Sequence, residues 1–259
     1  MKTIHLPRTA LRVSQLCLGT NQFGTALDDA RAFEMLDAFR ALGGNFIDTA
    51  HSYADWIPGA PRAASEHAIG RWLARQRRDS VVIATKGCEF DYSAGYEPRV
   101  TPEHLRADLE ASLEALGTAW IDLYWLHRDD PSHPVEAIVD ALIEHQRAGR
   151  IRHFGCSNWS VERILAAQRH AASRNHEGFV ACQPMWGLAE PDRTAMQQYA
   201  PGGYYGLLQV FDSTTFAPLT SRLGLTMQTM RRAPILTSPP GAPRGFHATV
   251  TGHDVALQW

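Results

Sequence analysis

The feature that most constrains the fold is an alternation of short apolar segments with longer helix-like segments. The apolar segments are short enough for strands, and the clearest, at residues 81–86, is rich in β-branched residues. The strand-like segments are residues 16–20, 45–48, 81–86, 120–126, 151–156 and 179–183. Such an alternation predicts parallel strands that are joined by right-handed crossover helices.

The segments between these strands show helical periodicity and helix end signals. Thr101 and Pro102 read as an N-cap followed by proline at the first helical position, Gly149 closes another segment, and Ser160 caps a third. The predicted helices cover residues 28–42, 65–77, a segment that begins at 101, 134–148 and a segment that follows Ser160. A sixth helix, after residue 183, has a weak signal.

Both a closed barrel and a doubly wound open sheet fit this order of elements. No G-x-G-x-x-G sequence follows a predicted strand, which disfavours a dinucleotide site of the doubly wound type. A chain of 259 residues is also close to the usual size of a (β/α)8 barrel. We therefore predict an α/β fold of the TIM (β/α)8 type, with a parallel barrel that is incomplete or atypically closed at its C-terminal end.

Polar residues lie at the carboxyl ends of these strands, or one residue beyond. They are Asp48, Lys86, His127, Ser157, Asn158 and Gln183. Because active sites of parallel barrels form at this rim, a polar residue on strand after strand predicts a shared pocket.

Three of these positions, with a nearby tyrosine, suggest a chemistry. Lys86 is one of only two lysines in a chain rich in arginine, which hints at a need for a compact amine. Tyr53 follows Asp48 by five residues. A tyrosine can protonate a carbonyl oxygen while hydride arrives at carbon, if a lysine ammonium lowers its pKa and a carboxylate holds that lysine. His127 would then orient the carbonyl by hydrogen bonding.

These residues and spacings resemble the aldo-keto reductase family. The family pattern is an Asp at the end of strand two, a Tyr five residues on, a Lys ending strand three and a His ending strand four, as at Asp48, Tyr53, Lys86 and His127. The remaining matches are the segments 18–20, 23–24, 65–70 and 155–158. The resemblance implies a hydride transfer between NADPH, with NADH as the alternative, and a small-molecule aldehyde or ketone.

The same resemblance implies a cofactor site. Ser157, Asn158 and Gln183 would hydrogen-bond the nicotinamide carboxamide, and Trp186 stands where the family places an aromatic ring stacked on the nicotinamide. The matched segment 18–20 brings Gly19 and Thr20 to the same site.

The resemblance extends over residues 1–206, and the remainder, 207–259, departs from it. That tail contains no Glu and no Lys, and it lacks the basic cluster with which the family grips the cofactor phosphate. We therefore divide the chain into a reductase-like barrel of six strands, 1–206, and an atypical tail, 207–259, in which residues 207–210 are the one candidate for a seventh strand.

Two other functions remain open. The protein is either an enzyme or a catalytically weak reductase-like binding module, similar to the beta subunits of potassium channels, because the phosphate clamp is missing. A third interpretation makes Lys86 the Schiff-base nucleophile of a barrel aldolase. Taken alone, Asp48 would be interpreted as a loop residue, Tyr53 as a packing residue and His127 as a core histidine.

Composition excludes several other classes. The net charge is −2 without a basic stripe, so we expect no nucleic-acid partner. No apolar run is long enough to span a membrane and no signal peptide opens the chain, so we expect a cytoplasmic protein. The four cysteines show no metal-site spacing, so we expect buried thiols and no metal. The oligomeric state is not predicted.

Overall fold

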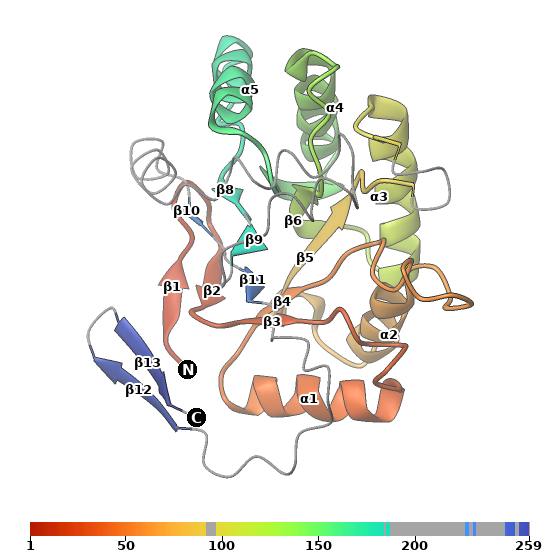
Figure 1. Cartoon of the computed structure of the whole chain (residues 1–259), viewed down its shortest axis with the longest axis vertical. Helices are drawn as coiled ribbons and strands as arrows, with labels where there is room; N and C mark the ends of the chain where they lie inside the picture. The colour runs from red at the N-terminus through yellow and green to blue at the C-terminus, as the bar shows by residue number, and fades with distance from the viewer. Residues whose placement is uncertain are drawn as a thin grey trace.

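The computed structural model describes residues 1–91 and 97–183, and beyond them the backbone of five short strands. Its centre is a parallel sheet of seven strands in the order β10-β8-β7-β6-β5-β4-β3. In chain order the strands of this sheet are β3 (Cys17–Gly19), β4 (Phe46–Asp48), β5 (Val82–Gly87), β6 (Ile121–Leu126), β7 (Ile151–Cys156), β8 (Ala181–Cys182) and β10 (Thr226–Met227). In the described residues β3 and β10 do not pair with each other, so the sheet is a curled, incomplete (β/α) barrel (Figure 1).

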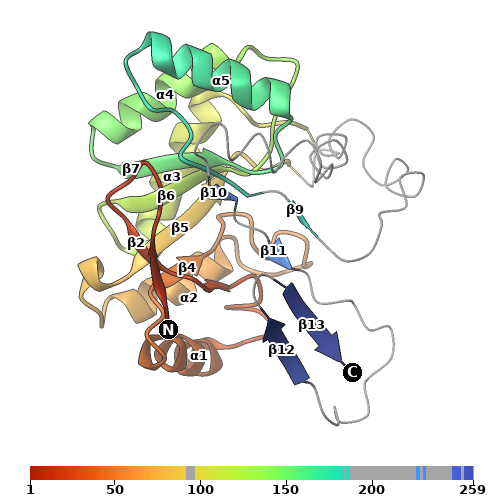
Figure 2. The same ribbon diagram turned by 90° about the vertical axis from the view of Figure 1, so that its left-hand side faces the viewer.

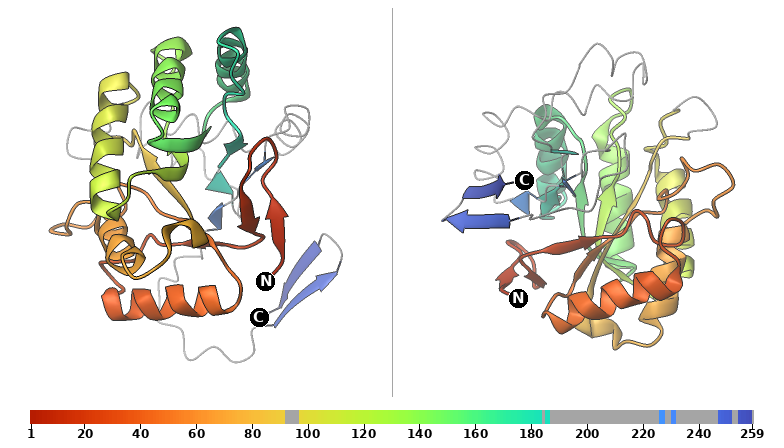
Figure 3. Two further views of the ribbon diagram at one scale, coloured as in Figure 1. Left: turned by 180° about the vertical axis from the view of Figure 1, so that it is seen from behind. Right: turned by 60° about the horizontal axis from the view of Figure 1, so that its bottom comes forward.

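Five helices follow successive strands and lie on the outer side of the curved sheet, as Figures 1 and 3 show from the front and from behind. They are α1 (Asp29–Ala41), α2 (Ala64–Leu73), α3 (Pro102–Leu116), α4 (Val135–Arg147) and α5 (Val161–Ser173), with a short 3-10 helix η1 (Arg78–Ser80) before β5. The expected strand–helix order and the barrel-type fold are confirmed. Because the helices cover only the outer face of the sheet, the inner face packs in a second, separate cluster.

The helix ends agree with the sequence signals, with one exception. Thr101 accepts a hydrogen bond from the backbone N–H of His104, Ser160 caps α5 in the same way, and Gly149 follows α4 with a φ of 73°. Helix α2 ends at Leu73 rather than at residue 77, because the chain turns there and enters η1.

The outer core lies between the helices and the sheet and is apolar. Its largest fully buried side chains include Trp72, Phe154 and Trp159. Burial of this surface is the main term that holds the helices to the sheet.

An antiparallel hairpin, β1 (Thr3–His5) with β2 (Arg12–Ser14), was not predicted. Leu6, Leu11 and Val13 from this hairpin pack with Leu123 and Trp125 from the inner face of β6. The hairpin therefore closes the amino-terminal end of the barrel, opposite the rim that carries the polar residues. Figure 2 shows it beside the sheet.

The part of the chain beyond residue 183 is described only as short strands. β9 (Met185–Trp186) pairs with β11 (Met230–Arg231) in parallel, and β12 (His247–Thr251) pairs with β13 (Asp254–Gln258) in antiparallel fashion. The seventh strand is β10, at residues 226–227, and the predicted candidate at 207–210 lies outside the described residues. The division into 1–206 and 207–259 stays a prediction.

Among the described residues, the longest apolar helical stretch is too short or too polar to cross a bilayer.

Candidate active site

Lys86 is the central residue of the site. It lies near the end of β5, its side chain is fully buried, and its Nζ donates three hydrogen bonds. The acceptors are Asp48 Oδ2 at 2.5 Å, the Thr49 carbonyl at 2.7 Å and the Tyr53 hydroxyl at 2.9 Å. All three ammonium hydrogens are thereby used, and the direct contact with Tyr53 that the proposed chemistry requires is present.

This ammonium keeps its proton. Burial lowers the pKa of Lys86, but the charge of Asp48 and the contact with Tyr53 outweigh burial, so that its pKa is raised above the ordinary value. Lys86 also lies 4.7 Å from the centre of the Tyr53 ring. The site therefore holds a fixed positive charge at the phenol.

Tyr53 remains a neutral phenol, contrary to the expected acidification. The side chain is buried, and burial raises its pKa; Lys86 lowers the pKa and Asp48 raises it again, which gives a value of about 12. Asp48 offsets part of the effect of Lys86, because the carboxylate and the ammonium act on the phenol with opposite sign. The sequence-based expectation of a lowered pKa was wrong on this point, although a neutral phenol still has a proton to donate.

Asp48 also contacts Gln183, the residue that follows β8. Its Oδ1 accepts a hydrogen bond from Gln183 Nε2 at 3.2 Å. A carboxylate only accepts, so the NH₂ end of the Gln183 amide must face Asp48. The Oε1 end is then buried without a hydrogen-bond partner among the described residues. An unpaired buried acceptor at this position fits the amide N–H of a nicotinamide carboxamide.

Gly19 and Thr20 lie beside Asp48 at the end of β3. Gly19 is exposed, and no described heavy atom lies within 4 Å of where its Cβ would stand, so a ligand has room to pass. Thr20 is buried; its hydroxyl donates to the Asp48 carbonyl at 2.9 Å and contacts the Ser65 hydroxyl at 2.8 Å. These bonds tie β3, β4 and α2 together, so the Thr20 hydroxyl supports the rim itself.

Ser157 and Asn158 follow β7, at the same rim. The Ser157 hydroxyl donates to the Gln183 carbonyl at 2.8 Å, and Asn158 Nδ2 donates to Ser157 Oγ at 2.9 Å. Asn158 has a φ of 61°, a conformation that asparagine tolerates better than most residues. Trp186 lies in β9, where the structure describes the backbone but not the side chain.

His127 lies directly after β6, with its ring centre 6.2 Å from that of Tyr53. Its Nδ1 is 2.9 Å from Glu89 Oε2, and the other carboxylate oxygen of Glu89 accepts from Arg128 Nε at 2.8 Å. Glu89 was not among the predicted site residues. No motif marks it, but its place three residues after Lys86 puts it at the same strand end.

A second buried histidine–carboxylate pair lies behind the loop that carries Tyr53. His51 Nδ1 is 3.0 Å from Glu66 Oε2, and Glu66 Oε1 accepts from the Thr85 hydroxyl at 2.5 Å. Burial lowers the pKa of His51, but Glu66 outweighs it and the pKa is raised. This pair fixes helix α2 against strand β5 and supports the loop.

Of three tryptophans near the rim, two are packed into the interior. Trp125 and Trp159 are fully buried, whereas Trp56 is 48% exposed and meets Tyr53 edge to face at 6.1 Å. Trp56 is therefore the described aromatic residue best placed to contact a substrate.

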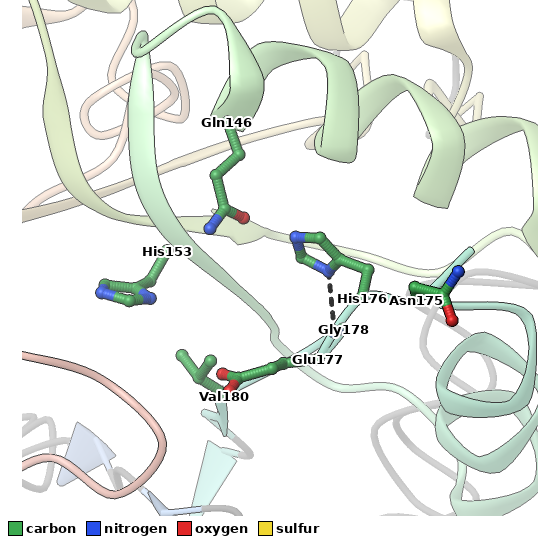
Figure 4. Close-up of a pocket in the computed structure, with 7 residues that line it drawn as sticks. All are labelled: Gln146, His153, Asn175, His176, Glu177, Gly178 and Val180. Carbon is green, nitrogen blue, oxygen red and sulfur yellow. Dashed lines mark hydrogen bonds between the residues drawn. The ribbon is translucent and has the colours of Figure 1, made fainter. Parts of the chain in front are cut away.

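A small hollow of about 150 Å³ lies elsewhere, near the amino-terminal ends of β7 and β8 (Figure 4). It is lined by Gln146, His153, Asn175, His176, Glu177, Gly178 and Val180. His176 accepts a hydrogen bond from the Gly178 backbone and stacks on Phe154, so its ring serves packing. None of its lining residues belongs to the polar rim. In the described residues, no group of three or more His, Cys, Asp or Glu side chains converges as metal ligands would.

The chain was also compared with known proteins. The model of the aldo/keto reductase family matches residues 15–196. An uncharacterised oxidoreductase, YrpG, of Bacillus subtilis is 36% identical over an alignment of 211 residues that covers 78% of this chain and 62% of that protein. Norsolorinic acid reductase B of Aspergillus parasiticus is 32% identical over 205 residues, 72% of this chain and 50% of that protein.

A solved structure shares the fold. It is that of the aldo-keto reductase AKR11C1 from Bacillus halodurans in its holo form, with a TM-score of 0.67 at 23% identity, covering 88% of this chain and 65% of the other. The chain thus spans between about half and two thirds of the length of these proteins. With its matched segment covering more than half of the sequence, the chain belongs to the aldo/keto reductase family.

Proposed function

We propose that this protein is an NAD(P)H-dependent oxidoreductase that interconverts a small-molecule aldehyde or ketone and its alcohol. The observation that carries the proposal is the buried chain of contacts from Asp48 through Lys86 to the Tyr53 hydroxyl. This arrangement holds one phenolic proton beside a fixed positive charge at the rim of a parallel barrel.

The residues divide the work of reduction between them. Tyr53 donates its proton to the carbonyl oxygen, and the Lys86 ammonium stabilises the phenolate that is left. Asp48 holds Lys86 in place and in its charged form. His127 contacts the carbonyl oxygen from the other side and so fixes its orientation.

A nicotinamide cofactor, when bound, would supply the hydride. We assign the recognition of its carboxamide to Gln183, whose Oε1 is an unpaired buried acceptor among the described residues, with Ser157 and Asn158 at the same rim. Gly19 gives the cofactor room beside Asp48, and Thr20 braces that edge. Trp186 is proposed to stack on the ring. NADPH is the expected donor, with NADH as the alternative.

The substrate side of the site has an apolar element. The half-exposed ring of Trp56 stands beside Tyr53 and offers a flat surface next to the proton donor. We therefore propose carbonyl compounds with an apolar or aromatic group as the first to be tested.

A cofactor titration tests the proposal. The purified chain is titrated with NADPH and with NADH, and binding is followed by cofactor fluorescence. Consumption is then followed after an aromatic aldehyde is added. We expect binding and aldehyde-dependent consumption; a chain that binds neither cofactor refutes the proposal.

The binding-module alternative has a specific basis. The expected phosphate clamp would lie beyond residue 206, where the chain departs from the family pattern. Saturable NADPH binding without consumption of any aldehyde or ketone supports this alternative over the enzyme.

The aldolase alternative conflicts with the state of Lys86. A Schiff base needs a neutral amine, whereas the Lys86 ammonium donates three hydrogen bonds and its raised pKa keeps it charged. Borohydride treatment in the presence of an aldehyde or ketone should therefore leave Lys86 unmodified; a trapped adduct on Lys86 would reinstate the aldolase.

A further inference from the structure

Glu89 is a buried carboxylate that no part of the proposed chemistry has used. It is 3% exposed and lies three residues after Lys86, in the segment that leaves β5. Cys88, between β5 and Glu89, has a φ of 60°, in the left-handed region. The same strand end thus delivers an ammonium and a carboxylate to one site.

Among the described residues, the contacts of this carboxylate are with hydrogen-bond donors. Oε1 accepts from Arg128 Nε at 2.8 Å and from the Phe90 backbone N–H at 3.2 Å, and Oε2 lies 2.9 Å from His127 Nδ1. Burial raises the pKa of Glu89, but Arg128 and His127 outweigh burial and bring the pKa to about 2. Glu89 is therefore ionised at neutral pH and accepts at both oxygens.

An ionised carboxylate determines which nitrogen of His127 carries a hydrogen. Since Oε2 has no proton to give, Nδ1 of His127 must donate to it, in the neutral ring as in the charged one. The Ser52 hydroxyl, 3.3 Å from the same nitrogen, is the weaker neighbour. Nε2 has no hydrogen-bond partner among the described residues and is the nitrogen left for a ligand.

We propose that Glu89, held by Arg128, is a positioning residue that aims His127 and fixes a hydrogen on Nδ1. Nε2 then faces the substrate oxygen: in the protonated ring it donates a hydrogen bond to a carbonyl oxygen, and in the neutral ring it accepts one from an alcohol hydroxyl. This inference rests on the proposed function for the role of the substrate oxygen, but the tautomer and the charge balance follow from contacts alone. Glu89 acts through His127 and touches neither substrate nor cofactor.

The charges around His127 come from three elements. Glu89 follows β5, Arg128 follows His127 on the loop after β6, and Lys86 stands within β5, with the neutral Tyr53 beside them from the loop after β4. Burial lowers the pKa of His127, Glu89 raises it, and Arg128 and Lys86 lower it, with a net decrease. Glu89 and Arg128 therefore act on the imidazolium in opposite directions.

The direction in which the His127 pKa shifts in two variants therefore distinguishes an electrostatic role of the trio from a purely structural one. Glu89→Gln removes the negative charge and should lower the pKa of His127, by about one unit or more for a buried pair. Arg128→Leu removes the positive charge and should raise it. If the trio only held the loop in shape, both variants would loosen it and move the titration of His127 in the same direction.

The experiment reads His127 directly, by ¹⁵N and ¹H NMR of the imidazole, with its signals assigned by comparison with His127→Asn. In the wild-type protein we expect neutral His127 to carry its hydrogen on Nδ1. The pH dependence of kcat/KM for aldehyde reduction is measured in parallel. Its His127-linked limb should move to lower pH in Glu89→Gln and to higher pH in Arg128→Leu.

The chain contains a matched control trio at its surface. Asp140 contacts His170 Nε2 at 2.8 Å and Arg174 Nη2 at 2.6 Å, between α4 and α5. Asp140→Asn removes a carboxylate from an equivalent His–Arg bridge away from the rim, and it should leave both the His127 titration and kcat/KM unchanged.

The outcomes are separable. A hydrogen on Nε2 in neutral wild-type His127, or shifts of the same sign in Glu89→Gln and Arg128→Leu, overturns the proposal on Glu89. Because the tautomer is read without cofactor, a chain that binds no NADPH refutes the proposed function without deciding this test. If Glu89→Gln does not fold, the proposal is tested by two other measurements: the tautomer of wild-type His127, and the pKa of His127 in Arg128→Leu, which should rise.

Discussion

At the scale of single residues, the buried ion pair of Lys86 and Asp48 should contribute strongly to stability. A fully buried ammonium is tolerated because three acceptors surround it, of which one is charged. Asp48→Ala would leave that ammonium with two neutral acceptors, so we expect a loss of about 3–5 kcal/mol in the free energy of unfolding. Urea denaturation measures the loss.

The matched control for this variant is an exposed pair. Arg77 and Asp79 lie 3.0 Å apart with side chains 84% and 62% exposed, so Asp79→Ala should cost at most about 1 kcal/mol. Equal losses in the two variants would contradict the view that Lys86 depends on Asp48.

Acid should unfold the protein in part through Glu89. Its pKa falls from the ordinary 4.5 to about 2 on folding, so the stabilisation that it contributes is present above about pH 4.5 and is lost as the pH falls towards 2. The wild type should therefore lose stability faster than Glu89→Gln over this range, by up to about 3 kcal/mol. Urea denaturation at several pH values measures it. Glu34→Gln, at an exposed pair with Arg31, should track the wild type, and parallel curves for Glu89→Gln would refute the linkage.

The residues of the site were predictable to different degrees. Asp48, Tyr53, Lys86 and His127 could be found because strand ends and spacing bring them to one rim. In the structure Asp48 and Tyr53 each accept a hydrogen bond from Lys86. Glu89 could not be found, because a loop glutamate carries no periodicity and its partner lies 38 positions away along the chain. Nor does the sequence show that burial outweighs Lys86 in the pKa of Tyr53.

At the scale of elements, the inner face of the sheet depends on one glycine. A Cβ at Gly155 in β7 would lie 2.6 Å from the Trp125 ring and 2.5 Å from the Ala181 carbonyl. Gly155→Ala should therefore destabilise the protein by about 1–3 kcal/mol through overpacking. Gly19→Ala, where no described atom is within 4 Å, should not. Thermal unfolding of both variants measures the difference. Equal melting temperatures would show that the structure accommodates a Cβ at Gly155 and would contradict the prediction.

The order of elements followed from the sequence because each strand–helix unit carries its own local signals. The six predicted strands and five helices were found, with ends displaced by a few residues, as at α2, where the turn after Leu73 had no sequence marker. The hairpin β1–β2 was missed because its strands have three residues each, and their exposed or mixed pattern resembles that of a loop. The pairing of β10 (residues 226–227) with β8 was also not predicted, because contacts between segments so far apart along the chain produce no local sequence pattern.

At the scale of the whole molecule, we expect one end of the barrel to contribute to stability and the other to ligand binding. The hairpin closes the amino-terminal end through Leu6, Leu11 and Val13, and the polar rim lies at the carboxyl-terminal end. Leu11→Ala should cost about 2–5 kcal/mol of stability and leave the NADPH dissociation constant unchanged in buffer where the variant is folded. Denaturation and fluorescence titration on one preparation measure both, and a loss of cofactor affinity would contradict the separation.

The most direct test of the whole account is Tyr53→Phe, which removes one hydroxyl and keeps the ring that packs against Trp56 and His127. The measurement is NADPH consumption with an aldehyde, together with the NADPH dissociation constant, for wild type and variant. We predict that turnover falls by at least about 100-fold, because the general acid is lost, while cofactor affinity stays within about twofold. A variant that reduces the aldehyde as fast as the wild type would contradict the assignment of Tyr53 as the proton donor.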